Sequence, residues 1–246
     1  MNLSARRETR FGVPPSGGSG APPPEGGTPN GVSRGAAGAF GHALSAVILA
    51  GGESRRMGQD KAWLEMGGQP LIRRALSTVR DSGIQEVLIS GRAGTDYSTL
   101  GCPVLFDLEP GCGPLGGIER GLAEATAPLV LVLAVDLPGI TAAFLRKLAT
   151  HCDPLTGAVP KLRGELEPLA AIYPKRCHSI VRDCLLNFRR AARDFADACL
   201  REHAVRTFSV SAADARCFDN WNSPADMRHE LHELSLIPGA AIRGNS

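Results

Sequence analysis

A glycine turn followed by arginines and a lysine is the first stretch whose side chains could do chemistry. Val47-Ile48-Leu49 is an apolar run typical of a buried parallel strand, and it ends directly at Ala50-Gly51-Gly52. Glycines at a strand end let the backbone turn sharply and open its N–H groups to an anion. Arg55, Arg56 and Lys61 follow, and such cations bind phosphate groups. This order of strand, glycine turn and cations predicts a nucleoside-triphosphate site, although an ordinary glycine turn with a solvated basic loop is the alternative.

A carboxylate at the end of the most apolar run is the second candidate. Residues 128–135 are continuously apolar and predict a central strand buried on both faces, and Asp136 follows directly. A carboxylate there costs free energy unless it is paired or binds a cation. A turn aspartate before Pro138 is one interpretation. Beside a triphosphate loop a Mg²⁺ ligand is favoured, because magnesium binds carboxylate oxygens together with substrate phosphates.

The elements between these motifs predict how they are brought together. A helix is expected over 70–83, with Pro70 at its first position, and strands over 86–90 and 103–106. This strand–helix–strand spacing is typical of a parallel βαβ unit. Because ligands bind beyond the carboxyl ends of such strands, Gly51, Ser90 and Asp107 should share one edge of the sheet.

The stretch 109–117 is rich in glycine and proline and precedes a further helix. Pro114 suits the first helical position, and Ile118, Leu122 and Ala125 form an apolar stripe behind it. A helix N-terminus built from small residues admits a ligand group closely. We therefore expect Gly113–Gly117 to take part in the site, although no role is assigned to any one of them. An ordinary connection into a helix would give the same sequence pattern.

The second half of the chain continues the alternation of strands and helices. Thr141 should cap a helix, strands are expected at 158–160 and 168–173, and a helix should run from Pro174 to Phe188. A second helix through Leu200, a strand over 204–210 and a capped helix start at Ser223-Pro224 complete the pattern. The prediction is a single α/β domain, a mostly parallel twisted sheet with helices on both faces.

Composition bounds the domain and its surroundings. Residues 1–41 are rich in Gly and Pro and predict a disordered tail or an extension upstream of the true start; the domain is expected over 42–238, with a flexible C-terminus over 239–246. Lys and Arg number 27 against 25 Asp and Glu, so charge gives no argument for a nucleic-acid or membrane partner. Seven dispersed cysteines without a C-x-x-C pair indicate reduced thiols and a cytoplasmic location.

The spacing L-A-G-G-x-S-x-R-M-G-x-D-K, from Leu49 to Lys61, resembles the signature loop of the molybdenum cofactor guanylyltransferases, the MobA-type nucleotidyltransferases. The resemblance extends from Ala46 to about Leu236. It implies a Rossmann-like nucleotidyltransferase fold and transfer of GMP from MgGTP to the phosphate of molybdopterin, with release of pyrophosphate. It also implies GTP, molybdopterin and a carrier or recipient molybdoenzyme as partners.

The resemblance further implies which residues form the site. The GTP-binding residues would be Leu49, Ala50, Gly51, Gly52, Lys61, Ser90, Asp107 and Asp136. Lys61, Arg56 and Asp136 would be catalytic, with Asp136 as the Mg²⁺ ligand. The acceptor side would comprise Gly113, Pro114, Leu115, Gly116, Gly117, Asn220 and Asn222. Ser90 departs from the family pattern, which more often has asparagine there.

Two alternatives stay open. A related enzyme could transfer CMP to molybdopterin or activate a sugar phosphate, although relatives that use CTP usually show L-A-A-G, so that Gly51 favours GTP. A non-catalytic nucleotide-binding or cofactor-delivery protein could keep the fold, although Lys61 and Asp136 weigh against it. Glu167 and the cluster Arg189-Arg190-Arg193 have no assigned role.

Overall fold

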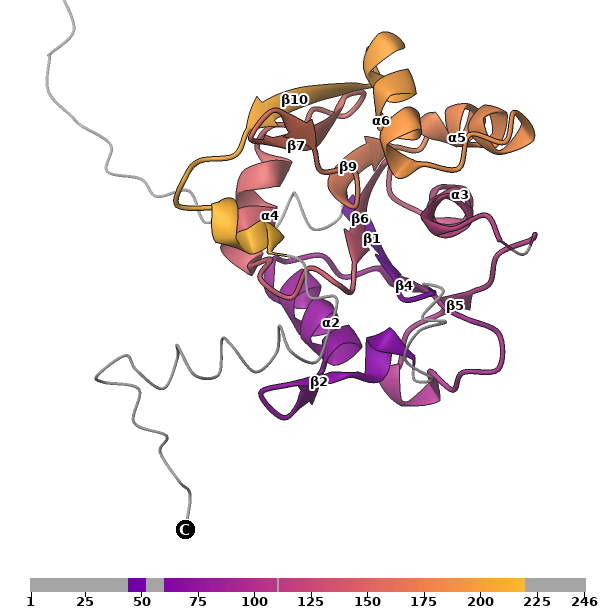
Figure 1. Cartoon of the computed structure of the whole chain (residues 1–246), viewed down its shortest axis with the longest axis vertical. Helices are drawn as coiled ribbons and strands as arrows, with labels where there is room; N and C mark the ends of the chain where they lie inside the picture. The colour runs from indigo at the N-terminus through magenta and orange to yellow at the C-terminus, as the bar shows by residue number, and fades with distance from the viewer. Residues whose placement is uncertain (1–43, 52–59, 110, 220–246) are drawn as a thin grey trace, which may run out of the picture. The chain divides into compact units, whose positions relative to one another are not determined.

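The computed structural model describes residues 44–51, 60–109 and 111–219 (Figure 1). Several predictions lie outside these ranges: the tail over 1–41, the C-terminus over 239–246, the helix start at Ser223, and the site residues Gly52, Arg56, Asn220 and Asn222.

Within the described residues, eight strands form one sheet in the order β10-β7-β9-β6-β1-β4-β5, with β8 paired to β7. The strands are β1 (Leu44–Leu49), β4 (Val87–Ser90), β5 (Val104–Leu105), β6 (Leu129–Ala134), β7 (Gly157–Leu162), β8 (Glu165–Leu166), β9 (Ala170–Pro174) and β10 (Val205–Ser209). β1 pairs in parallel with β4 and β6, β4 with β5, and β10 with β7. β9 is antiparallel to β6 and β7. The predicted mostly parallel sheet is confirmed.

Helices cover both faces of this sheet, as predicted. Figure 1 shows α2 (Leu71–Asp81) and α4 (Ala142–Ala149) on one side, and α3 (Pro114–Glu124), α5 (Cys177–Leu186) and α6 (Ala192–Arg201) on the other. The alternation along β1 explains both layers. Ala46 and Ile48 pack with α2 and α4, whereas Val47 and Leu49 pack with α3, α5 and α6. A strand buried on both faces is apolar throughout, which is the pattern of β1 and β6.

Two prolines end strands rather than begin helices. Pro70 closes the hairpin of β2 (Glu65–Met66) and β3 (Gln69–Pro70), and its extended ψ of 140° makes it the N-cap residue of α2 instead of its first helical residue. Pro174 ends β9 opposite Leu129, and α5 begins only at Cys177. In both cases strand pairing of the proline outweighs the preference of proline for a helix start.

The connections place a site at the carboxyl ends of β1 and β6. The chain leaves β1 towards α2 on one face, whereas α3, on the other face, leads into β6. Where neighbouring connections diverge in this way, a crevice forms beyond the strand ends. None of the described helices combines the length and the hydropathy needed to cross a membrane.

Candidate active site

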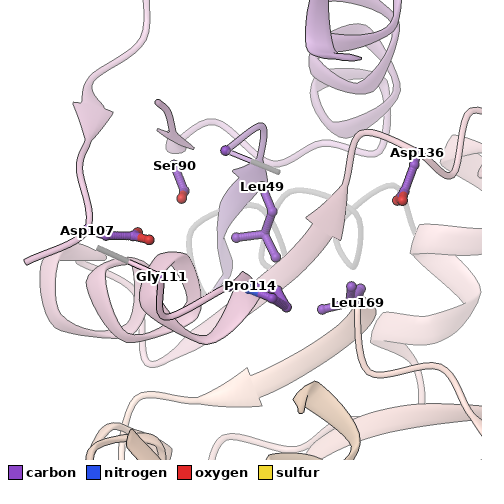
Figure 2. A pocket seen from close by; sticks show the side chains of 9 residues that line it. Leu49, Ser90, Asp107, Gly111, Pro114, Asp136 and Leu169 are labelled. Atoms are coloured by element: carbon purple, nitrogen blue, oxygen red, sulfur yellow. The ribbon is translucent and has the colours of Figure 1, made fainter. Parts of the chain in front are cut away.

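A cavity of about 450 Å³ lies at this edge of the sheet. It is lined by Leu49, Gly51, Ser90, Asp107, Gly111, Gly113, Pro114, Asp136 and Leu169. Figure 2 shows Asp107 and Asp136 at opposite ends, with Leu49 between them. Its volume is in the range of small-molecule sites. The structure thus brings together five of the residues expected to bind nucleotide and two expected on the acceptor side.

The Asp136 end of the cavity carries a pair of opposite charges. The Nζ atom of Lys61 lies 3.3 Å from Oδ2 of Asp136, and their side chains are 21% and 32% exposed. Lys61 belongs to the short 3-10 helix η1 (Lys61–Trp63), and Asp136 follows β6. A cation and a carboxylate that keep contact with solvent can each bind a charged ligand group without a large desolvation cost.

The donor set at Asp136 fits a metal ion that arrives with its substrate. Among the described residues, no group of three or more His, Cys, Asp or Glu side chains could hold a metal ion alone. Magnesium usually binds through one or two carboxylates, waters and substrate phosphates, rather than in an all-protein cage. Asp136, a partly exposed carboxylate that lines the cavity, matches this mode of binding.

The opposite end of the cavity is built around Asp107. Burial first, and then the charge of Glu119, raise the pKa of the Asp107 carboxyl. Glu119 is itself buried, and its Oε1 lies 2.8 Å from Nε2 of His178. Ser90, at the end of β4, is also buried, with 4% of its surface exposed. A partly desolvated carboxylate favours a ligand that offers hydrogen-bond donors.

The glycines at the start of α3 matter because they have no side chain. A Cβ atom on Gly116 would lie 2.6 Å from Cγ of Asp107, and one on Gly117 would overlap Oγ of Ser90 and lie 2.7 Å from Cδ2 of Leu49. Only glycine therefore lets α3 pack so closely against the cavity residues. Gly113 and Pro114, the N-cap residue and first residue of α3, line the cavity directly.

Two of the predicted site residues that do not line the cavity, Leu115 and Ala50, are buried in the core. Leu115 is fully buried in the core between α3 and the sheet. Ala50 is 2% exposed, and its N–H donates to the carbonyl of Ser90 at 2.8 Å. Its N–H is therefore already used in joining β1 to β4, whereas Gly51 is exposed at the cavity.

Sequence reasoning missed Gly111 and Leu169. The carbonyl of Leu169 accepts from the N–H of Ala134 at 2.9 Å, so the pairing of β9 with β6 brings Leu169 to the cavity. Glu167, which has no assigned role in the sequence analysis, is not among the residues that line the cavity, whereas the apolar Leu169 is. The carbonyl of Gly111 accepts from Nη1 of Arg190 at 2.8 Å. Within the same arginine cluster, Arg193 forms an ion pair with Glu165.

Comparison with known proteins finds a family model and several relatives that match this chain. Residues 46–206 match the model of the MobA-like NTP transferase domain. A probable molybdenum cofactor guanylyltransferase of Opitutus terrae is 37% identical over 191 residues, which cover 76% of this chain and 95% of that protein. The molybdenum cofactor guanylyltransferase of Xanthomonas euvesicatoria is 31% identical over 190 residues, covering 76% and 94%.

Solved structures share the fold at lower identity. Molybdopterin-guanine dinucleotide biosynthesis protein A from Archaeoglobus fulgidus superposes with a TM-score of 0.61 at 22% identity, covering 78% of this chain and 98% of that one. The 2-C-methyl-D-erythritol 4-phosphate cytidylyltransferase of Thermus thermophilus gives 0.59 at 19%, covering 77% and 98%. The fold thus occurs in proteins that are named for different nucleotides.

Proposed function

Because the chain belongs to the MobA-like NTP transferase family, we propose that it transfers GMP from GTP to the phosphate of molybdopterin. The products are the guanine dinucleotide form of the cofactor and pyrophosphate. The observation that carries the proposal is one cavity with Asp107 at one end and Asp136, whose carboxylate contacts Lys61, at the other. The two ends of the cavity provide separate places for the phosphates, at Asp136, and for the nucleoside, at Asp107.

The reaction needs placement and charge neutralisation more than covalent help from the protein. An oxygen of the acceptor phosphate attacks the α-phosphorus, a new P–O bond forms, and the bond to pyrophosphate breaks. The ammonium group of Lys61 stabilises the negative charge on the transferred and leaving groups. Arg56, outside the described residues, is proposed to add a second cation.

Asp136 is the residue that would hold the divalent metal, which we propose to be Mg²⁺. Members of this family use a divalent metal, which when bound neutralises phosphate charge and aligns the reacting groups. The contact of Asp136 with Lys61 is compatible with this role, because both groups would face the same phosphates.

The nucleoside is proposed to lie at the Asp107 end. The Asp107 carboxyl accepts hydrogen bonds from donors on guanosine, and the absence of a Cβ atom on Gly116 leaves room for that carboxyl. Gly113 and Pro114 shape the acceptor side. Ser90 is proposed to contact the nucleoside, with a shorter side chain than the asparagine more common in the family.

Product analysis tests the proposed function. Purified protein is incubated with Mg²⁺, molybdopterin and each of the four nucleoside triphosphates in turn, and the products are identified by mass. The expected product is the molybdopterin guanine dinucleotide, formed with GTP only. A cytidine dinucleotide would replace the guanylyl assignment by the cytidylyl alternative, and nucleotide binding without turnover would support a delivery protein.

A cytoplasmic location and a carrier or recipient molybdoenzyme as partner are also proposed. All seven cysteines lie in the described part of the chain and are free thiols, which suits a reducing compartment. Cell fractionation, and cross-linking to molybdoenzymes of the same cell, would test these two points.

A further inference from the structure

The carboxylate of Asp60, the residue before Lys61, is fully engaged in hydrogen bonds. Its Oδ1 accepts from the N–H of Ala62 at 3.1 Å and so caps η1. Its Oδ2 accepts from Oγ1 of Thr95 at 3.0 Å and from the hydroxyl of Tyr97 at 3.2 Å. One side chain therefore joins the helix that carries Lys61 to the loop that follows β4.

Tyr97 is a rigid anchor for this connection. Its side chain is buried, with 3% exposed, and its ring stacks on Trp63 of η1 with centroids 6.2 Å apart. Its hydroxyl also accepts from the N–H of Arg92 at 3.1 Å. A Cβ atom on Gly91 would lie 2.6 Å from the ring, so the ring packs directly against the backbone that follows Ser90. Tyr97 therefore fixes the position of η1 relative to the end of β4.

We propose that Asp60 is a positioning residue that directs Lys61 to the phosphate end of the cavity. It acts through Lys61 and does not touch substrate. The contacts run from the end of β4 through Tyr97 and Asp60 to η1, and from Lys61 to Asp136 at the end of β6. This inference rests on the proposed function, in which Lys61 binds phosphate.

A carboxylate suits this place better than an amide. Both oxygens of Asp60 accept, and Oδ2 receives two hydroxyl donors. Asparagine caps a helix about as well as aspartate, so Asp60→Asn keeps the bond to Ala62. It places an N–H₂ group against the two hydroxyls, which removes the acceptor that fixes η1 to the loop.

The test is a double-mutant cycle of Asp60→Asn and Lys61→Ala, measured by calorimetry with inorganic tripolyphosphate and by kcat and KM for GTP. Asp60→Asn should lower kcat by roughly tenfold to a hundredfold, because small errors in the position of a catalytic group are costly. In the Lys61→Ala background it should cause no further loss in kcat or in tripolyphosphate affinity. Equal losses in both backgrounds would show that Asp60 acts independently of Lys61 and would overturn the proposal.

Two further variants separate position from stability. Tyr97→Phe keeps the cap and removes one donor to Asp60, so it should lower kcat in the same direction by a smaller factor. The control is Glu86→Gln: the Glu86 carboxylate accepts from Ser45 and from the N–H and hydroxyl of Thr126 at the other end of the strands. It should lower thermal stability and leave kcat unchanged.

The outcomes for the two proposals differ. The unmodified protein could form no dinucleotide and still bind tripolyphosphate, with Asp60→Asn lowering this affinity only when Lys61 is present. The proposed function would then fail, and the role of Asp60 would stand. If Asp60→Asn behaves like the unmodified protein in kcat and affinity, or if Glu86→Gln lowers kcat as much as Asp60→Asn does, the role of Asp60 is overturned.

Discussion

The ammonium of Lys61 lies 3.3 Å from the carboxylate of Asp136, although 75 positions separate the two residues in the chain. The 3-10 helix η1 supplies the lysine, and the end of the central strand β6 supplies the aspartate. Each group has a separate task in the proposed reaction, one as a cation and one as a metal ligand. Variants of the two should therefore fail in different ways.

Asp136→Asn should lower Mg²⁺-dependent turnover by at least roughly a hundredfold, because a neutral amide is a poor ligand for a hard cation. Folding should survive, since asparagine keeps the shape of the side chain. Steady-state rates across a magnesium titration provide the measurement, and excess metal should partly restore the activity. If Asp136 only forms a turn, asparagine would substitute well.

Lys61→Ala should also lose turnover, because a cation that stabilises the transition state is removed. The same magnesium titration should restore nothing, since the proposed metal ligand is intact. This contrast with Asp136→Asn is the diagnostic result. Turnover close to that of the unmodified protein in both variants would rule out the catalytic roles proposed for this pair.

The edge of the sheet that bears the site could be predicted because it depends on local patterns. The apolar runs of β1, β4 and β6 and the residues that follow them are contiguous in sequence, and parallel strands bring their carboxyl ends together. Gly51, Ser90 and Asp107, which were expected to share this edge, all line the cavity, and so does Asp136 at the end of β6. Pro114 at the first position of α3 follows from its fixed φ angle in the same way.

The remaining walls of the cavity depend on contacts between distant segments. Leu169 reaches the site only because β9 returns antiparallel beside β6, and an apolar residue gives no sign of such a role. Asp60 was visible within the motif, but its partners Thr95 and Tyr97 lie 35 and 37 residues away. Their pairing depends on tertiary packing, which periodicity and spacing do not encode.

Nucleotide choice should be visible without turnover. In the presence of Mg²⁺, GTP should raise the thermal midpoint of unfolding more than ATP, CTP or UTP, because a ligand that binds the folded state stabilises it by mass action. Differential scanning fluorimetry at equal nucleotide concentrations provides the comparison. A larger shift with CTP would favour the cytidylyl alternative.

Gly117→Ala should weaken nucleotide binding as well as stability. The added methyl group would press on Ser90 and Leu49 in the cavity wall, and overpacking of this kind costs about 1–3 kcal/mol. Gly121→Ala is the matched control one turn further along α3, where the methyl group would lie 2.7 Å from Val47 in the core. The control should lose stability in urea unfolding and keep its KM for GTP. Equal KM values in both variants would contradict a role of Gly117 in shaping the cavity.

Removal of residues 1–41 should change little. Their composition is poor in residues that could bury apolar surface, and β1 begins only at Leu44. The thermal midpoint and kcat of the shortened chain should match those of the full chain. A large loss of solubility or activity would show that this segment contributes to the domain.

Asp107→Asn should make the free protein more stable at neutral pH while weakening nucleotide binding. Burial and the nearby Glu119 raise the pKa of Asp107, so as the pH rises the unfolded chain releases this proton first, at about pH 3.9, and the folded state releases it at a higher pH. Stability contributed by the protonated form is present below the unfolded pKa and declines as pH rises through the folded pKa. Asparagine does not titrate, so the stability of the variant does not fall with pH for this reason.

The stability gain of Asp107→Asn over the unmodified protein should therefore grow from about pH 4 upward until the raised pKa is passed, and then stay constant. Urea unfolding at a series of pH values measures it. Asp96→Asn is a control of opposite sign, because hydrogen bonds from Ser98 lower the pKa of the exposed Asp96 carboxyl. Compared with the unmodified protein, that variant should be destabilised most at neutral pH, and the difference should shrink as the pH falls. A pH-independent difference for Asp107→Asn would mean that the carboxyl is as well solvated in the folded protein as in the unfolded chain, and the nucleoside end of the cavity would then lack the desolvated acceptor proposed for it.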